Sequence, residues 1–508
     1  VRLATRGVVA LTHWSLWLGL SLVLGFQVYI LLAKQLTVPA FVLRQLTAGL
    51  ATYGFNAEFG RTQFDPLGRV LLENLRLIPN TVGEPVLTAR AVYLQLDPWK
   101  LLIRDVDLTD IDLMGVDLLV PSMFSPDGTA STLVRNLHAT LRLPGEKREI
   151  EFTDLDGYIG SLAVTVRGSI AVGSGGNRIP ELTGLVPSYL QFARTIAPQV
   201  AQLQRLTEPR LQLTLTPDPA RLAVVDANFT AARAVVPGGN GGIPFPVTAD
   251  QIAAYTVFPL RSAGLIPLDL AISMGDVAVE NQGTAHQVRA HVTGTISRDP
   301  TRFSPATVEI ATNRVEVRGV PLSPIAARLE SAAESNAVFD AVGVIAGADW
   351  TAAGLIETSS GRGTVAARGR IPPSLLALVG SRTGIALVNQ LDYEGAPAVR
   401  AVVRLGAGGR PESAEGSVVA GRVTARDVPL EGASARFAWS GTQVDVADIV
   451  LRTPHSTAQG SYSMDTTSRA FRFLLDGELQ PGDINGWFRE WWSQFWTNFD
   501  FSAELPRA

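Results

Sequence analysis

The chain has 508 residues, of which 46% are hydrophobic and 18% charged, and its formal net charge is −4. The absence of cysteine excludes disulfide bonds and thiolate metal sites. The slight negative charge provides no basic surface for nucleic acid, so we exclude that class of partner. One apolar helix explains only part of the apolar content, so we expect a large core or uncovered apolar surface in the remainder.

The segment Val8–Ala33 predicts a transmembrane anchor. It contains no formally charged residue and exceeds the ~20 apolar residues that span a bilayer. Trp14 and Trp17 lie towards its first end, where amphipathic rings favour the membrane interface. Two arginines in residues 1–7 favour a cytoplasmic N-terminus. A cleaved secretory signal is the alternative, but the apolar run does not close with small residues at a cleavage site.

Residues 34–54 predict a short membrane-proximal helix. Pro39 can begin a helix, and Gly54 can end one. Between them, Phe41, Leu43, Leu46 and Leu50 recur at helical spacing. We expect this helix to lie against the membrane or to plug the near end of the structure that follows.

From residue 55 onward the apolar residues alternate with polar ones, which predicts antiparallel strands with one apolar face. Turn-forming glycine and proline clusters separate the strands. We divide this β region into 55–305 and 306–480. The predicted helical interruptions fall at about 182–206, 322–334 and 373–379.

Two pairs of similar segments recur at one offset. Arg314–Leu322 resembles Arg422–Leu430, and Arg368–Ile371 resembles Asp476–Leu479, each 108 positions later. A shared offset predicts that 306–390 and 414–490 are two copies of one supersecondary unit.

No catalytic or metal-binding constellation is present in the sequence. His286 and His291 lie five positions apart on a predicted strand, which points them to opposite faces. The acidic run around Asp107, Asp110 and Asp112 is more typical of a solvated face than of a catalytic pair. No phosphate-binding loop or nucleophile elbow occurs. We therefore expect no enzyme, no metal and no cofactor.

The last segment, 481–508, predicts an aromatic helix and the chain end. Trp487, Trp491 and Phe495 form one row at helical spacing, and Phe488, Trp492 and Trp496 form the next. Such a helix either caps the sheet with its rings in the core, or lies at a bilayer interface or groove mouth. Residues after Phe499 read like the start of another strand, so we expect either a longer protein or a partner that completes the path.

The run Glu84–Leu96, followed by Trp99–Leu102 and Val106–Leu113, resembles the opening of AsmA/TamB-like proteins. The run from Gly421 to Leu479 is similar to the recurring module of that family. The resemblance covers nearly the whole chain and consists of alternating polar and apolar residues with sparse glycines and prolines.

The resemblance implies a mainly β fold, with an N-terminal transmembrane helix, a few short helices and an elongated, curved antiparallel sheet that forms an open apolar groove. It implies an anchor in a bacterial inner membrane, with most of the chain in the periplasm. The implied partners are membrane phospholipids, whose acyl chains slide along the groove, with outer-membrane or periplasmic proteins as further partners. An uncovered apolar sheet face independently favours an apolar ligand.

We expect inward apolar residues on several strands to contact lipid in the groove. We expect several tryptophans to contact the membrane or the end of the groove. The groove positions are Leu162, Val164, Val166, Ile170, Val288, Val292, Ile296, Phe471 and Phe473, and the tryptophans are Trp14, Trp17, Trp487, Trp491, Trp492 and Trp496.

Two other functions fit the same pattern. In the first alternative, the chain is an assembly factor that offers sheet edges to outer-membrane proteins by strand addition. In the second, it is an anchored β-sandwich with a purely structural role. Co-purified phospholipid distinguishes lipid transport from the sandwich.

Overall fold

The structure is a computed structural model that describes most of the chain. The residues outside the description are 1, 33–36, 39, 53, 66–67, 98–99, 101–107, 125–127, 144–148, 172–199, 201–202, 239–244, 261–264, 297–302, 318–319, 332–335, 346, 358, 373–374, 376–390, 489, 497 and 499–508, together with the side chains of 2–12, 26, 30–32, 303, 305, 320, 490, 493 and 496.

The chain divides into two compact units. Unit 1 comprises residues 1–230 with 257–263, and unit 2 comprises 231–256 with 264–508. The described strands fall into a large sheet of 26 strands and a small sheet of three, which confirms the mainly β class.

Unit 1 begins with two helices. Helix α1 spans Arg2–Leu32 and covers most of the predicted anchor. Its described leucine and tryptophan side chains are exposed, with Trp14 at 74% and Trp17 at 54%. Within the part of the chain that the structure describes, no helix combines the length and apolar character needed to cross a membrane.

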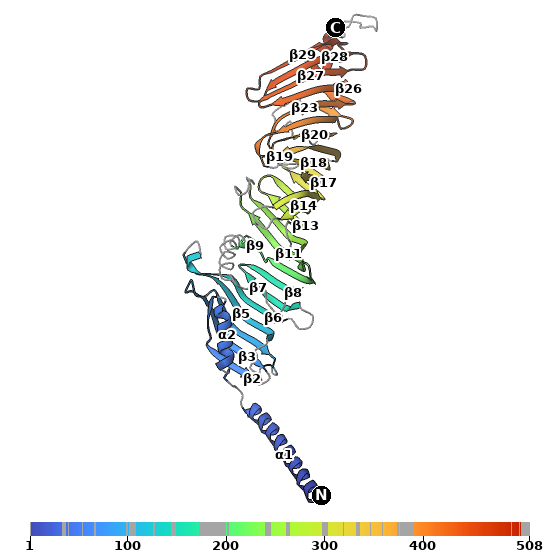
Figure 1. Cartoon of the computed structure of the whole chain (residues 1–508). Helices are drawn as coiled ribbons and strands as arrows, with labels where there is room; N and C mark the ends of the chain where they lie inside the picture. The colour runs from blue at the N-terminus through green and yellow to red at the C-terminus, as the bar shows by residue number, and fades with distance from the viewer. Residues whose placement is uncertain are drawn as a thin grey trace. The chain divides into compact units, whose positions relative to one another are not determined.

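The helix predicted within 34–54 is present as α2, Ala40–Thr52, which lies against the first strands of the sheet (Figure 1). Its Val42 is fully buried and belongs to one hydrophobic cluster with Val70, Leu72 and Leu96. The apolar stripe of α2 therefore covers the near end of the apolar sheet face. This agrees with the predicted placement in which the helix plugs the near end of the structure that follows.

The first strands of the chain begin in unit 1. They are β1 Phe55–Glu58, β2 Arg61–Asp65, β3 Arg69–Pro79, β4 Leu87–Leu96, β5 Leu108–Val120, β6 Ser131–Arg142, β7 Glu149–Ile159, β8 Leu162–Ala171, β9 Leu206–Thr207, β10 Arg210–Asp218 and β11 Leu222–Val236, with a 3-10 turn η1 at Ser122–Phe124.

One pair in unit 1 is not antiparallel as the sequence predicted. β3 to β8 pair antiparallel with their neighbours, but β8 and β10 run parallel, with Val164 opposite Leu211. Parallel neighbours need a long crossover, and the chain between these strands contains the predicted helix at 182–206. Most of that helix lies outside the described residues, although Val200 and Leu203 are helical.

Most strands of unit 2 pair with the next strand of the large sheet along the chain (Figure 1). The strands of this unit are β13 Ile266–Val279, β14 Gly283–Ile296, β15 Phe303–Thr312, β16 Arg314–Val317, β17 Val320–Ser331, β18 Asn336–Ile345, β19 Ala348–Glu357, β20 Gly363–Arg370, β21 Leu391–Tyr393, β22 Ala398–Leu405, β23 Pro411–Ala420, β24 Val423–Ala425, β25 Val428–Leu430, β26 Gly432–Ser440, β27 Gln443–Arg452, β28 Thr457–Asp465 and β29 Phe471–Glu478, after β12 Val247–Pro259, which has residues in both units.

Short helical turns complete unit 2. They are η4 Ala407–Gly409, η5 Asn485–Trp487 and α6 Glu490–Trp496. β21, β24 and β25 form the small three-stranded sheet. The predicted helix at 373–379 lies outside the described residues except for Leu375, which is helical.

The predicted helix at 322–334 is wrong, because Val320–Ser331 is strand β17, paired with β15 and β18. The register on β18 shifts between Leu322 and Ile325, which marks a bulge. The bulge inserts residues between two inward positions and so produces the spacing of three that resembles a helix. Pro324 within this stretch also disfavours a helix interior.

The two repeated segments adopt the same hairpin register. Val317 pairs with Val320, and Ala425 pairs with Val428, so both ends of the hairpin are displaced by the same 108 positions. The correspondence continues downstream, where the Trp350–Gly369 pair matches the Ala458–Gly477 pair. The similarity of the two segments therefore extends from sequence to strand pairing.

A line of irregular backbone crosses three neighbouring strands of unit 2. Gln251 on β12 and Gln287 on β14 have positive φ values of 53°, and Gly275 lies between them on β13. The regular pairing of the three strands is interrupted at these residues. Left-handed residues within strands bend the chain, so this line provides local curvature of the sheet.

The main buried cluster of unit 2 lies beside the small sheet. Val428 is fully buried and packs with Leu430, Ala458 and Ile484, and Tyr393 is half-buried against them. Burial raises the pKa of the Tyr393 phenol to about 12, because the ionised form loses hydration there.

Alkaline pH is expected to destabilise this cluster through Tyr393. The folded-state pKa is about 12 against 10.0 for an unperturbed phenol, so the stabilising contribution is complete below pH 10 and is lost between pH 10 and 12. Denaturant unfolding across this range measures the loss. Tyr393→Phe should remove this component of the pH dependence, and an unchanged alkaline slope in that variant contradicts the assignment.

Candidate functional site

In unit 1 the strand register aligns apolar residues on one face of the sheet. Leu94 on β4 pairs with Ile111, which pairs with Leu141, which pairs with Phe152 on β7. Side chains of residues paired across antiparallel strands lie on the same face, so these four form one apolar line.

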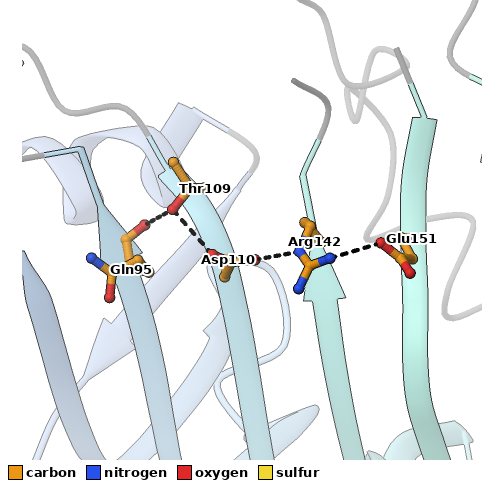
Figure 2. A network of polar contacts seen from close by, with 5 residues as sticks. All are labelled: Gln95, Thr109, Asp110, Arg142 and Glu151. Carbon is orange, nitrogen blue, oxygen red and sulfur yellow. Dashed lines mark hydrogen bonds and ion pairs between the residues drawn. The ribbon is translucent and has the colours of Figure 1, made fainter. Parts of the chain in front are cut away.

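The opposite face of the same strands carries a polar network (Figure 2). The Thr109 hydroxyl donates to the Gln95 carbonyl oxygen at 3.2 Å and to the carboxylate of Asp110 at 3.3 Å. Arg142 joins Asp110 at 3.3 Å to Glu151 at 3.1 Å. These side chains are substantially exposed, so each pair contributes only about 0–1 kcal/mol. The network identifies this face as the one in water.

In unit 2 the register extends the same arrangement over many strands. Successive pairings connect one residue on each strand of the large sheet from β13 to β29, except β16. This first apolar row is Leu270, Val292, Val308, Leu329, Phe339, Gly354, Val365, Val403, Ala414, Trp439, Val444, Met464 and Phe471.

A second apolar row lies two residues away along each strand, on the same face. It consists of Ile272, Ala290, Ile310, Ala327, Ala341, Ala352, Ala367, Ala401, Gly416, Phe437, Val446, Tyr462 and Phe473. Neither row contains a charged residue. The one hydroxyl, on Tyr462, donates to the sulfur of Met464 in the first row at 3.0 Å.

The middle of the second row consists of small side chains. From β17 to β23 it contains alanines and ends on Gly416, and we call this stretch, Ala327–Gly416 along the row, the alanine lane. Larger residues flank the lane on both sides, with Val365 and Val403 on one side and Trp350 on the other. Positions two apart on a strand are ~6.6 Å apart, so the flanking rows are separated by about 13 Å.

Large side chains lie directly over glycines on this face. A Cβ added at Gly369 would collide with the indole of Trp350, and one added at Gly416 would collide with the ring of Phe437 and the backbone of Arg400. The two glycines therefore let bulky rings lie close to the backbone at the side and at the end of the alanine lane.

Burial distinguishes the two faces of unit 2. On β20, residues of the apolar face are partly buried, whereas the alternate residues, such as Thr364 and Arg368, are exposed. The described residues of β13–β23 form no buried hydrophobic cluster of their own. From β13 to β23 the apolar rows are thus shielded from water only partly, and no buried cluster covers them within the described residues. Near the end of the sheet, β21, β24 and β25 pack against Leu451, Ala458 and Leu475 of β27–β29.

The predicted groove residues lie at three places in the fold. Leu162, Val164, Val166 and Ile170 lie on β8 in unit 1, where the first two are 8% and 9% exposed. Val166 pairs with Leu155 and Leu213, so it belongs to the apolar face of that unit.

The remaining predicted groove residues lie in unit 2. Val288, Val292 and Ile296 lie on β14. Val292 and Phe471 occur in the first apolar row, towards its two ends, and Phe473 occurs in the second row. Phe471 is 70% exposed and Phe473 49%, because they lie on the last strand of the sheet.

The C-terminal aromatic helix is shorter than predicted. Trp487 lies in the 3-10 turn η5 and packs in the buried cluster, where its indole nitrogen donates to the Ala425 carbonyl at 2.8 Å. It therefore does not share a helical row with Trp491, because α6 begins at Glu490. Trp491 is 53% exposed and stacks on Trp492 at 4.3 Å between ring centroids. The Trp496 side chain lies outside the described residues.

The polar face of unit 2 contains a shallow hollow of about 1110 Å³. Charged residues of both signs line it, among them Asp340, Arg400, Glu415 and Arg436. Residues of the alanine lane, which alternate with these along the strands, also border it. Arg436 forms an ion pair with Asp448. Val342, Val402 and Ala438 also line this hollow, so it combines charged and apolar side chains.

The titratable groups give no indication of catalysis in the described part of the chain. His286 contacts Asp276 at 2.6 Å, and His291 contacts Asp269 at 2.7 Å, all on exposed strand surfaces. Among the described residues, no group of three or more His, Asp and Glu side chains is arranged to hold a metal ion.

The sequence analysis did not identify the alanine lane. Ala341, Ala352, Ala367 and Ala401 are individually ordinary, and only the register places them side by side. The alternation of small residues along β20, from Gly363 to Gly369, is the one local signal that could have indicated it.

Comparison of the sequence with known proteins found no matching protein-family model and no matching curated protein. The likeness to AsmA/TamB-like proteins is therefore a hypothesis that the sequence motifs alone support.

Proposed function

We propose that this protein binds phospholipid acyl chains along the apolar face of its sheet and conducts them between membranes or otherwise maintains the lipid composition of the cell envelope. The observation that carries the proposal is the pair of apolar rows that crosses unit 2 without a charged residue. An uncovered apolar surface of this extent is costly in water, and acyl chains would cover it.

The shape of the face supports a chain-like ligand. The alanine lane is narrow, is flanked by larger apolar side chains, and runs across strands rather than ending in a closed pocket. A site of this kind provides contact along the length of an acyl chain and leaves the polar headgroup in water. It offers no convergent polar groups such as a soluble small-molecule site has.

We propose helix α1 as the anchor that places the remainder of the chain in the periplasm next to the inner membrane. The exposed side chains of its described part support this assignment, including Leu16, Trp17 and Leu22 at 69%, 54% and 68%. Large apolar side chains exposed in this way along a helix would be stabilised in a lipid environment.

Phospholipid is expected to co-purify with the full chain. The protein is extracted from membranes in a mild detergent, washed with lipid-free detergent, and analysed by native mass spectrometry and by lipid extraction. Bound phospholipid in stoichiometric or greater amount supports the proposal. A preparation that carries none, and that takes up no fluorescent phospholipid from vesicles, contradicts it.

A membrane protein of similar size with a closed core, purified in the same detergent, is the control for lipid carried over in the micelle. Equal, small amounts of phospholipid in both preparations would show carry-over in the micelle rather than binding. Uptake measured after the anchor residues 1–33 are replaced by a cleavable signal distinguishes lipid on the sheet from lipid around α1.

A further inference from the structure

The last strand of the large sheet has one edge without a strand partner among the described residues. β29 pairs with β28 along its length. Its side chains are exposed almost throughout, with Phe471 at 70%, Phe473 at 49% and Leu474 at 49%. A strand at the edge of a sheet presents backbone donors and acceptors that can pair with another strand.

Two features that normally prevent strand pairing are absent from β29. It is eight residues long and contains neither proline nor a bulge. At the corresponding place in the first repeated segment, β20 pairs along its whole length with β22. The repeat therefore has the backbone geometry to accept a strand at this edge.

The sequence of β29 is complementary to itself in one antiparallel register. With a two-fold axis at Leu474, Arg472 lies opposite Asp476 of the second copy, and the reciprocal pair forms as well. Neither side chain has an ion-pair partner among the described residues of its own chain. Opposite charges directly across an antiparallel pair are stabilising, and like charges are destabilising.

The apolar face agrees with the same register. Phe473 lies opposite Leu475 of the second copy, and Phe471 lies opposite Gly477 of the second copy. An aromatic ring across from a glycine on a neighbouring strand covers the bare backbone. Both apolar rows would then continue onto the apolar face of the second copy.

We propose that the chain forms a two-fold symmetric homodimer in which β29 pairs antiparallel with β29 of a second copy. The dimer joins the two large sheets edge to edge, so that the apolar face of one sheet continues into the apolar face of the other. This inference goes beyond the proposed function, and its test does not involve lipid. One strand pair buries less than the ~800 Å² per partner of a standard interface, so the dimer is expected to depend on concentration.

Site-specific disulfide formation tests the register, because the chain contains no cysteine. Leu474→Cys in the full chain should give a disulfide-linked dimer on mild oxidation, since residues on the two-fold axis have Cα atoms within disulfide range. Ser461→Cys is the matched control. Ser461 lies on β28 and pairs with Leu474 of β29, so it is one strand further from the axis and should not cross-link.

Charge exchange tests the contact independently. Arg472→Asp alone and Asp476→Arg alone should each lower the association constant by about tenfold or more, measured by mass photometry over a concentration series. The double variant, Arg472→Asp with Asp476→Arg, should restore it. Equal cross-linking at both cysteine positions overturns the proposal. So does a chain that stays monomeric throughout, as it would if residues 499–508 or a different protein occupied the edge.

Discussion

Val365→Asp should abolish phospholipid binding at the alanine lane, whereas Thr364→Asp should leave it intact. The two residues are neighbours on β20, and only Val365 faces the apolar rows. A carboxylate beneath an acyl chain loses its hydration, which costs several kcal/mol. Each ~1.4 kcal/mol corresponds to a factor of ten in affinity, so we expect a loss of at least about tenfold.

Stability and binding can be separated at this position. Val365 is only partly buried, so the free energy of unfolding should fall by about 1–2 kcal/mol, within the range of ordinary substitutions. Lipid uptake from vesicles and amide hydrogen exchange in β19–β22 are measured on both variants. Equal lipid binding by the two aspartate variants, with exchange unchanged, would place the lipid elsewhere on the protein.

Leu96→Ala should produce the largest loss of stability in unit 1. Leu96 is 1% exposed and belongs to the cluster that α2 forms with β3 and β4. Removing most of a buried leucine side chain from a packed core leaves a cavity, and such changes lower the free energy of unfolding by about 2–5 kcal/mol. Faster hydrogen exchange of the β3 and β4 amides should report the loss.

Met114→Ala is the matched control for this prediction. Met114 lies on the neighbouring strand β5 and is 45% exposed, so a similar truncation there removes little buried surface. We expect a change within about 0.5 kcal/mol. If the two variants lost equal stability, the cluster beneath α2 would not be the main core of this unit.

Local patterns in the sequence predicted the elements whose cause is local. The spacing of Phe41 and Leu46 predicted a helix that is confirmed as α2, and the period of two predicted strands along most of the chain. The repeated segments around Val317 and Ala425 indicated two similar hairpins, and both have the same register. For the helix and the strands the signal lies within a few residues, the range over which backbone geometry sets side-chain direction.

Errors occurred where a distant contact or a backbone irregularity decides the structure. The Leu322–Ile325 spacing mimics a helix because a bulge separates two inward positions of β17. Trp487 was expected to share a helical row with Trp491, yet it lies in the buried cluster with its indole bonded to Ala425, far away in the sequence. Neither outcome is visible in a short window.

The sequence by itself therefore determined a mainly β chain whose strands have one apolar face, preceded by a long helix. The tertiary structure alone decided which residues of that face lie next to one another. The apolar rows and the alanine lane exist because successive strands pair in one register, and each pairing joins residues from separate segments of the chain. A shift of one residue in any pair would move the strand's apolar side chains to the polar face.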